Sequence, residues 1–371
     1  MSLDGKTLGL ALSGGGYRAA LFGLGSLWRL NEVGLLGRLD RITSVSGGSI
    51  LSGVLAHRWN TLAFDNGRAS NFEAEVATPV RAMCSKTIDI SVALWGALTP
   101  FRSAGDFLVD KYRDELFGRT TLKELPQPTA DKVPVFIFYA TNMQTGRSFR
   151  MRQDYIADWT IGRSHKTVVS LAEAVAASSA FPPVFSPIVL ETQATDWHGA
   201  PDGVKDLEAL RSRIVLADGG VYDNMGMEAL VDNVDMSFVS DAGAPFKIDV
   251  SPPEDTAFQL GRVRDILIDQ TRALRKRWLV SDYIAGRKRG AYWGIGTHID
   301  EYGRADALTR DNALTAELEA IPTRLNSFPA LQQGRLINWG YALCDAALRS
   351  RAGLDIGPLA RWPVESAALS G

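Results

Sequence analysis

A serine near the N-terminus lies in the pattern of a nucleophile held in a tight turn. Ser46 ends an apolar run over residues 39–45 and precedes two glycines, Gly47 and Gly48, after which a helical pattern begins. A turn that joins a buried strand to a helix so sharply that its neighbours must be small is the layout of a nucleophile elbow, which exposes the serine hydroxyl. The usual pattern has glycine two residues before the nucleophile, where this chain has Ser44, whose side chain is also small. We predict that Ser46 is a nucleophile; the alternative is a serine that only caps the following helix.

An aspartate is the predicted base for this serine. A serine hydroxyl is a weak nucleophile until a base takes its proton, and histidine is the usual base. The four histidines of the chain are His57, His165, His198 and His298. None of them has the sequence context of a base, whereas Asp218 ends an apolar run over residues 213–217 and precedes two glycines, and α/β active sites lie at such strand ends. Asp223 and Asp241 lie on similar turns and stay open as competing candidates.

A second glycine-rich turn contains Gly14, Gly15 and Gly16, between an apolar run over residues 7–12 and another helical pattern. Such a turn gathers free backbone N–H groups and the positive end of a helix dipole, which suits negative charge. The segment also fits the G-x-G-x-x-A pattern of dinucleotide sites. That kind of site needs an acid at the end of the second strand, where this chain has a serine turn. We therefore interpret the glycines as stabilising an anion other than a dinucleotide.

The elements that must hold these residues follow an α/β order. Over the first fifty residues, apolar runs and glycine turns alternate as strand, turn, helix, strand, turn, helix, which predicts a parallel α/β fold. We expect strands over residues 7–12, 39–45, 133–140, 213–217 and 236–239, and helices over 17–33, 47–59 and 171–180. The chain has 371 residues and no linker or repeat. One domain over 1–371 is favoured, with the catalytic motifs within 7–245 and a helical C-terminal portion over about 255–350.

Composition argues against several classes of function. Apolar residues make up 46% and charged residues 22% of the chain, as in folded globular proteins. The 40 basic and 42 acidic residues give a net charge of −2, which offers no support for binding a nucleic-acid polymer. With 4 histidines and 2 cysteines, we expect neither a metal nor a cofactor. Without a secretory signal or a membrane-spanning stretch, we expect a cytoplasmic protein, peripheral at most to the inner membrane surface.

Two segments are candidates for contact with a membrane. Residues 90–101 form a short apolar stretch that contains Trp95, and they fit either a lid or interfacial helix or a buried core helix. Residues 262–289 contain nine basic and three acidic residues, which gives a local charge of +6. This basic segment is a candidate site for an anionic lipid or a nucleotide-type activator, and the alternative is a solvated helix face.

Taken together, three segments resemble the patatin-like phospholipase family. The segments are Gly14-Gly-Gly-x-Arg18, Ser44-Val-Ser46-Gly-Gly48 and Asp218-Gly-Gly220. They occur in the order of the family's motifs, and the helical pattern before two prolines near residue 182 and the residues 221–226 also resemble family segments, so the resemblance covers roughly residues 7–245. It implies a three-layer α/β/α sandwich with a mainly parallel central sheet and a Ser–Asp dyad without histidine.

The resemblance also implies a role for each site residue. Ser46 is then the nucleophile and Asp218 the general base, and the backbone amides of Gly14, Gly15 and Gly16 form the oxyanion hole. Arg18 occupies the family's arginine position, where it either lies near the anionic group of the substrate or helps to hold the loop. This chain departs from the family pattern by having Ala19 and Ser44 in place of glycines. Because both substitutes are small, we expect changes of geometry rather than loss of activity.

The implied activity is that of a lipid acyl hydrolase of the phospholipase A or lysophospholipase kind. It would cleave carboxylic esters through an acyl-enzyme, its partner would be a membrane phospholipid or lysophospholipid, and it would need no cofactor. A carboxylesterase that acts on short soluble acyl esters is an alternative. A ligand-regulated effector or a non-catalytic binding protein on the same fold is another.

Overall fold

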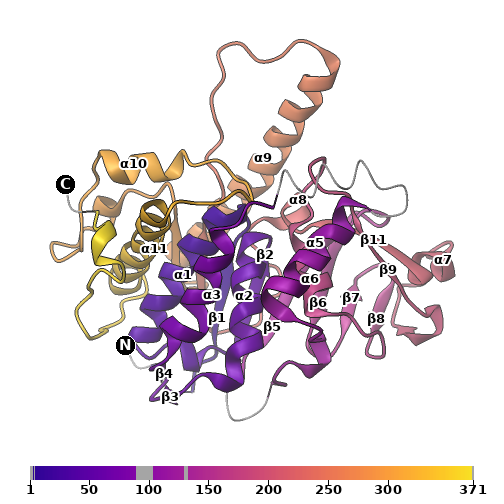
Figure 1. The fold of residues 1–371 in the computed structure, drawn as a ribbon, viewed down its shortest axis with the longest axis horizontal. Helices are drawn as coiled ribbons and strands as arrows, with labels where there is room; N and C mark the ends of the chain where they lie inside the picture. The colour runs from indigo at the N-terminus through magenta and orange to yellow at the C-terminus, as the bar shows by residue number, and fades with distance from the viewer. Residues whose placement is uncertain (1–2, 4, 89–102, 129–132, 370–371) are drawn as a thin grey trace.

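The structure is a computed structural model that describes residues 3, 5–88, 103–128 and 133–369. The candidate lid or core helix at residues 90–101 lies outside the described residues. Within these ranges, one large sheet runs through the molecule and helices pack against it (Figure 1).

The centre of this sheet is parallel. In spatial order it contains β5 (Val135–Asn142), β2 (Arg41–Val45), β1 (Leu8–Leu12), β12 (Met236–Asp241) and β13 (Arg289–Gly294). Antiparallel strands extend it beyond β5: β6 (Arg147–Arg152), β7 (Ile156–Asp158), β8 (Gly162–Ser164) and β10 (Trp197–His198). Two more antiparallel strands branch from β5, namely β11 (Arg213–Asp218) and β9 (Ile188–Glu191). A separate hairpin consists of β3 (Phe64–Asp65) and β4 (Arg68–Ala69). The sheet is mixed, and its parallel centre confirms the predicted α/β class.

Both faces of the parallel centre are buried. Successive residues of a strand point to opposite faces. In β1, Leu10 and Leu12 join the large apolar core on one face, whereas Ala11 joins a smaller cluster on the other face. A strand covered on both sides needs apolar residues at every position, which explains the continuous apolar run of β1.

Helices form the layers on either side. Their bounds are α1 (Gly16–Glu32), α2 (Gly47–Arg58), α3 (Thr78–Cys84), α5 (Ala104–Tyr112), α6 (Leu171–Ser179), α7 (Leu207–Ser212), α8 (Gly220–Asp223), α9 (Thr256–Ile284), α10 (Ala313–Glu319) and α11 (Ala330–Ser350). The larger core includes residues of α1, α2, α6 and α11, while the smaller cluster includes Met225, Leu230 and the C-terminal part of α9 through Leu279. The three-layer arrangement predicted for the chain is therefore present around the parallel strands.

Helices α1 and α11 touch through their backbones. A Cβ atom added at Gly25 of α1 would lie 1.9 Å from the carbonyl oxygen of Ile337, and one added at Gly340 of α11 would lie 1.9 Å from that of Phe22. Real atoms do not approach this closely, so both positions require glycine. The C-terminal helix is thus packed firmly against the helix that follows the first glycine turn.

The C-terminal part of the chain is less purely helical than the sequence pattern indicates. Strand β13 lies within the portion predicted to be helical, and it pairs with β12 in the parallel centre of the sheet. Its Ala291 and Trp293 are fully buried. The helix before it, α9, begins well away from the sheet, and Figure 1 shows its first turns standing clear of the other elements. Every helix in the described ranges is too short or too polar to cross a membrane.

Candidate active site

Ser46 occupies a strained turn between β2 and α2. Its φ of 52° and ψ of −121° lie in a region that residues other than glycine rarely adopt. Such strain persists only where surrounding contacts enforce it, and it is typical of a serine presented at a nucleophile elbow. The Ser46 N–H donates to both the carbonyl oxygen and the hydroxyl of Ser178 in α6, at 3.1 and 2.9 Å. Helix α6 therefore holds the backbone of the turn at Ser46.

The Ser178 hydroxyl belongs to a buried chain of serines beneath this turn. It lies 2.8 Å from the hydroxyl of Ser49, which donates to Ser44 at 3.0 Å. Ser44 stands where the family has glycine, and its hydroxyl is used here to tie β2 to the first turn of α2. Neither Ser178 nor this role of Ser44 was predicted, although the helix before the double proline was among the segments that resemble the family.

The glycines after Ser46 are required by contact with the first glycine turn. A Cβ atom at Gly47 would lie 1.8 Å from the carbonyl oxygen of Gly16, and one at Gly48 would lie 2.4 Å from that of Leu12. The two glycine-rich turns predicted from the sequence therefore pack directly on each other at the ends of the neighbouring strands β1 and β2.

Asp218 reaches Ser46 from the antiparallel strand β11. Strand β11 pairs with the last residues of β5, and Asp218 is level with Ala140. In the parallel pairing of β2 with β5, Val45 is level with Tyr139, so the next residue, Ser46, comes to the level of Ala140 as well. The sequence predicted Asp218 at a strand end on the carboxyl edge of the sheet, and the structure places it at this edge. The direction of β11, antiparallel to β5, was not predicted.

The Asp218 carboxylate is buried beside the nucleophile candidate. It is 2% exposed and accepts a hydrogen bond from the N–H of Gly220 at 2.6 Å, and the Ser46 hydroxyl lies near enough to lower its pKa. Burial raises the pKa of Asp218 from 3.8 to about 7, and the Gly220 N–H and the Ser46 hydroxyl oppose that rise because they stabilise the charged form. A carboxylate with this pKa, beside a serine hydroxyl, is suited to take its proton near neutral pH.

The three glycines predicted for the oxyanion hole differ in what their amides do. The Gly14 N–H donates to the carbonyl oxygen of Asn224 at 2.9 Å, so this donor is already used. For the N–H groups of Gly15 and Gly16, the described part of the chain provides no acceptor. Gly15 has a φ of 142° and Gly16 a φ of 59°, conformations that favour glycine. The donors available to an oxyanion are therefore those of Gly15 and Gly16.

Asn224 also explains why glycines surround the dyad. A Cβ atom at Gly14 would lie 2.3 Å from the Asn224 side-chain oxygen, and one at Gly220 would lie 2.6 Å from it. The Asn224 side chain thus fills the space between the first glycine turn and the turn after Asp218. The pattern around residue 224 resembles the family, but this contact was not predicted.

Arg18 lies in α1 and is fully buried. Its guanidinium donates to the carbonyl oxygen of Ala242 at 2.7 and 3.1 Å, to the hydroxyl of Thr323 at 2.9 Å and to the carbonyl oxygen of Ile321. Burial lowers the pKa of Arg18 to about 10, so the side chain stays charged at neutral pH. Of the two roles considered for Arg18, this geometry favours holding the loop over contact with a substrate.

The competing carboxylates have other partners. Asp223 accepts from the N–H groups of Met225 and Met227, and Asp241 accepts from the Tyr292 hydroxyl at 2.8 Å. Among the three aspartates considered, Asp218 is the one that the structure brings to Ser46.

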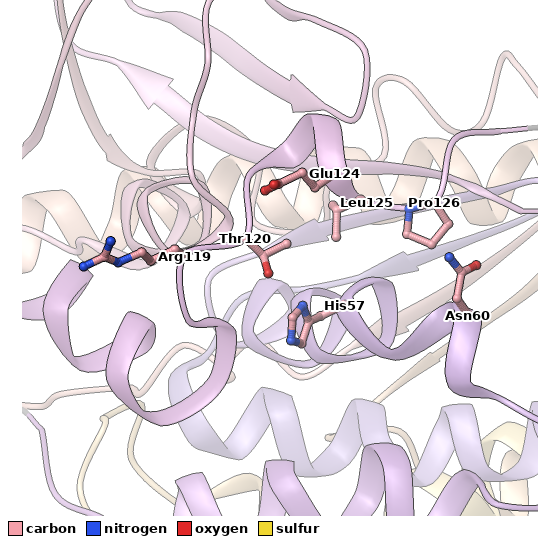
Figure 2. Close-up of a pocket in the computed structure, with 7 residues that line it drawn as sticks. All are labelled: His57, Asn60, Arg119, Thr120, Glu124, Leu125 and Pro126. Atoms are coloured by element: carbon pink, nitrogen blue, oxygen red, sulfur yellow. The ribbon is translucent and has the colours of Figure 1, made fainter.

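His57 lies at the opposite end of α2 from Ser46. The two residues are eleven positions apart, which corresponds to about 16 Å of helix. His57 lines a separate pocket of about 470 Å³ together with Asn60, Arg119 and Glu124 (Figure 2). Burial lowers its pKa, with a smaller contribution from Arg58. The histidine nearest to Ser46 in the sequence is therefore not placed to act on it.

The basic segment at residues 262–289 spans most of α9 and the turn after it. Several of its cations bind within the molecule. Arg272 donates to the carbonyl oxygen of Ala244 at 2.9 Å, Arg287 pairs with Asp282, and Lys288 pairs with Asp232 at 2.8 Å. An activator at this segment stays a prediction.

Comparisons with solved structures find distant similarities. No curated protein matches the chain. Among solved structures, VipD from Legionella pneumophila is similar with 16% identity and a TM-score of 0.42, over 93% of this chain and 67% of that one. The human GIVD cytosolic phospholipase A2 is similar with 12% identity and a TM-score of 0.39, over 63% of this chain and 42% of that one.

A family model supplies the assignment. The model described as patatin-like phospholipase matches residues 10–231, which is more than half of the chain and includes both glycine turns, Ser46 and Asp218. This range contains Ser46, Asp218 and the strands that precede them. The chain therefore belongs to the patatin-like phospholipase family, whose members are serine lipid acyl hydrolases.

Proposed function

We propose that the protein is a lipid acyl hydrolase that cleaves carboxylic esters with Ser46 as nucleophile and Asp218 as general base. The observation that carries the proposal is the proximity of the two side chains: the Ser46 hydroxyl lies beside a buried carboxylate whose pKa is raised to about 7 and stabilises its charged form. The strained turn at Ser46 supports it, because such strain is characteristic of functional sites.

The proposed reaction has two acyl-transfer steps. The ionised Asp218 takes the Ser46 proton while the serine oxygen attacks the ester carbonyl carbon. The N–H groups of Gly15 and Gly16 stabilise the resulting oxyanion; losing one such donor typically costs on the order of 10²–10³ in rate. The protonated Asp218 then gives its proton to the leaving alcohol, which leaves an acyl-Ser46 ester. In the second step, Asp218 takes a proton from a water whose oxygen attacks the acyl carbon. The protonated Asp218 then returns that proton to the Ser46 oxygen as the acyl–oxygen bond breaks, which releases the fatty acid and restores the free serine.

The proposed substrates are phospholipids or lysophospholipids, as family membership implies. The decisive experiment incubates the purified protein with mixed phospholipid vesicles, lysophospholipid micelles and short-chain nitrophenyl esters, followed by product analysis. We expect release of fatty acid from the lipids. Hydrolysis of the nitrophenyl esters alone would instead indicate a carboxylesterase of short soluble substrates.

Three variants test the dyad. Ser46→Ala and Asp218→Asn should abolish hydrolysis while the circular dichroism spectrum stays that of the parent. His57→Ala is the matched control, because His57 is at the other end of α2, and it should keep full activity. The dyad assignment would be wrong if Asp218→Asn kept activity and His57→Ala lost it.

A further inference from the structure

Helix α9 has a long part that the rest of the described molecule covers only in places. From Phe258 to Trp278 none of its residues is buried, whereas Leu279, the next residue, is fully buried against the body. At 1.5 Å per residue, this part is about 30 Å long. Its first turns stand clear of the other elements in Figure 1.

This part of α9 carries apolar side chains on one side. The large apolar residues that are between 45% and 73% exposed are Phe258, Leu260, Val263, Ile266, Leu267, Leu274 and Trp278. Five of them follow helical spacing and form what we call the α9 stripe: Leu260, Val263, Leu267, Leu274 and Trp278. In the loop before the helix, Ile248 and Val250 are 91% and 95% exposed. Contiguous exposed apolar surface of this kind marks an interaction site rather than an ordinary protein surface.

The charge of this region is opposite to that of the remaining chain. Residues 262–289 hold nine basic and three acidic residues, which leaves 31 basic and 39 acidic residues elsewhere. The Arg277 side chain, beside the α9 stripe, is exposed and has no hydrogen bond or ion pair with any described residue. Arg262 and Lys276 lie over the rings of Phe246 and Tyr292. The stripe is therefore flanked by cations that have no acidic partner.

Helix α9 is fixed to the two segments that hold the dyad. Arg275 donates to the carbonyl oxygen of Tyr222 at 3.1 Å, and Tyr222 lies in α8, which begins two residues after Asp218. Arg264 donates to the carbonyl oxygen of Pro182 at 3.2 Å, in the segment that follows α6. These contacts place this part of α9 on the same side of the molecule as the candidate active site.

We propose that the α9 stripe is the surface by which the protein docks on an anionic phospholipid membrane. The apolar side chains insert at the boundary between headgroups and acyl chains, and the flanking cations contact the anionic headgroups. The inference rests on the proposed function, since a lipid substrate brings the membrane to the side of the molecule that holds Ser46. A membrane fits better than a second copy of the chain, because a symmetric pair of stripes would bring the same cations face to face.

The test compares two double variants of exposed leucines. Leu260→Ser with Leu267→Ser removes part of the stripe, and Leu331→Ser with Leu359→Ser is a matched control at leucines that are 50% and 75% exposed elsewhere. Each protein is sedimented with phosphatidylcholine vesicles that either contain or lack phosphatidylglycerol. Phospholipid hydrolysis in the same vesicles and hydrolysis of a soluble nitrophenyl ester are then measured.

We expect the stripe variant to lose binding to anionic vesicles and hydrolysis of their lipids by at least about tenfold. Its hydrolysis of the soluble ester should stay within about twofold of the parent, as should all activities of the control. Added salt and omission of phosphatidylglycerol should weaken binding of the parent. Unchanged vesicle binding by the stripe variant would overturn the proposal, as would a parent dimer that this variant converts to monomers without loss of vesicle binding.

The outcomes separate this proposal from the proposed function. If the parent hydrolysed no ester and yet bound anionic vesicles through the stripe, the hydrolase proposal would fail and membrane docking would stand. If the parent and the stripe variant hydrolysed vesicle lipids equally well, the hydrolase proposal would stand and the docking proposal would fail.

Discussion

Replacing Asp218 by asparagine should stabilise the fold at alkaline pH while it abolishes hydrolysis. Burial raises the pKa of Asp218 from 3.8 to about 7. Each unit corresponds to about 1.36 kcal/mol, so above pH 7 the ionised carboxylate costs the folded state about 4 kcal/mol. Asparagine fits the site, because its oxygen accepts the Gly220 N–H and its NH₂ group lies beside the Ser46 hydroxyl. The variant keeps the hydrogen bond from Gly220 and carries no charge.

The sign of the pH dependence follows from proton uptake. Between pH 4 and 7 the folded state holds the Asp218 proton and the unfolded state has released it. The stabilisation that protonated Asp218 gives the folded state is therefore complete below the pKa of Asp218 in the unfolded chain. It is lost as the pH rises through the pKa of Asp218 in the folded protein. For the asparagine variant this dependence is absent. Relative to the parent, the variant should gain roughly 3 kcal/mol of unfolding free energy between pH 5 and pH 8.

Urea denaturation followed by tryptophan fluorescence measures this difference at several pH values. Asp202→Asn, at an exposed loop position, is the matched control and should show a difference from the parent that does not change with pH. A constant difference between Asp218→Asn and the parent from pH 5 to pH 8 would refute the raised pKa. The kcat/KM of the parent for a soluble ester should correspondingly rise with pH and level off above about 7.

Three further substitutions have definite expected outcomes. Gly47→Ala places a Cβ atom 1.8 Å from the Gly16 carbonyl oxygen, so it should displace the glycine turn and reduce kcat by at least about 100-fold; unchanged kcat would contradict the observed packing. Arg18→Leu leaves buried carbonyl oxygens without donors and should lower the unfolding free energy by about 3 kcal/mol or more in urea titrations; a variant of full stability but raised KM would instead indicate substrate contact. Ser178→Ala removes a donor-acceptor hydroxyl from beneath Ser46 and should lower kcat more than it raises KM, whereas an unaltered kcat would show that the backbone contact alone fixes the turn.

The parts of the site that local sequence patterns encode were predictable. A buried strand, a turn of small residues and a helix form a contiguous stretch, so the position of Ser46 between β2 and α2 follows from the residues themselves. The same holds for Asp218, which ends an apolar run and precedes two glycines. In both cases the information lies within about ten residues, and the predicted helices and strands around them are present.

The parts that depend on distant contacts were not predictable from one sequence. The Gly14 amide is used by Asn224, and Arg18 binds carbonyl oxygens at Ala242 and Ile321. No pattern near Gly14 or Arg18 reveals these partners, because the chain brings them together only when the whole sheet forms. The direction of a strand is another such property. The apolar run of β11 is compatible with a parallel or an antiparallel strand. It is antiparallel to β5 because of where the chain re-enters the sheet.

In the proposed mechanism, the raised pKa of Asp218 takes the place of a histidine base. Histidine suits general-base catalysis because its unperturbed pKa of about 6.5 lies near neutral pH, and an ordinary aspartate near 3.9 is too weak a base. In this chain, burial at the end of β11 raises the pKa of Asp218 to about 7. The Gly220 N–H fixes the orientation of the Asp218 carboxylate. A histidine base needs a third residue to orient its ring, whereas a carboxylate held by the backbone does not. The environment of one side chain thus supplies both the proton affinity and the orientation that a Ser–His–Asp triad distributes over two residues.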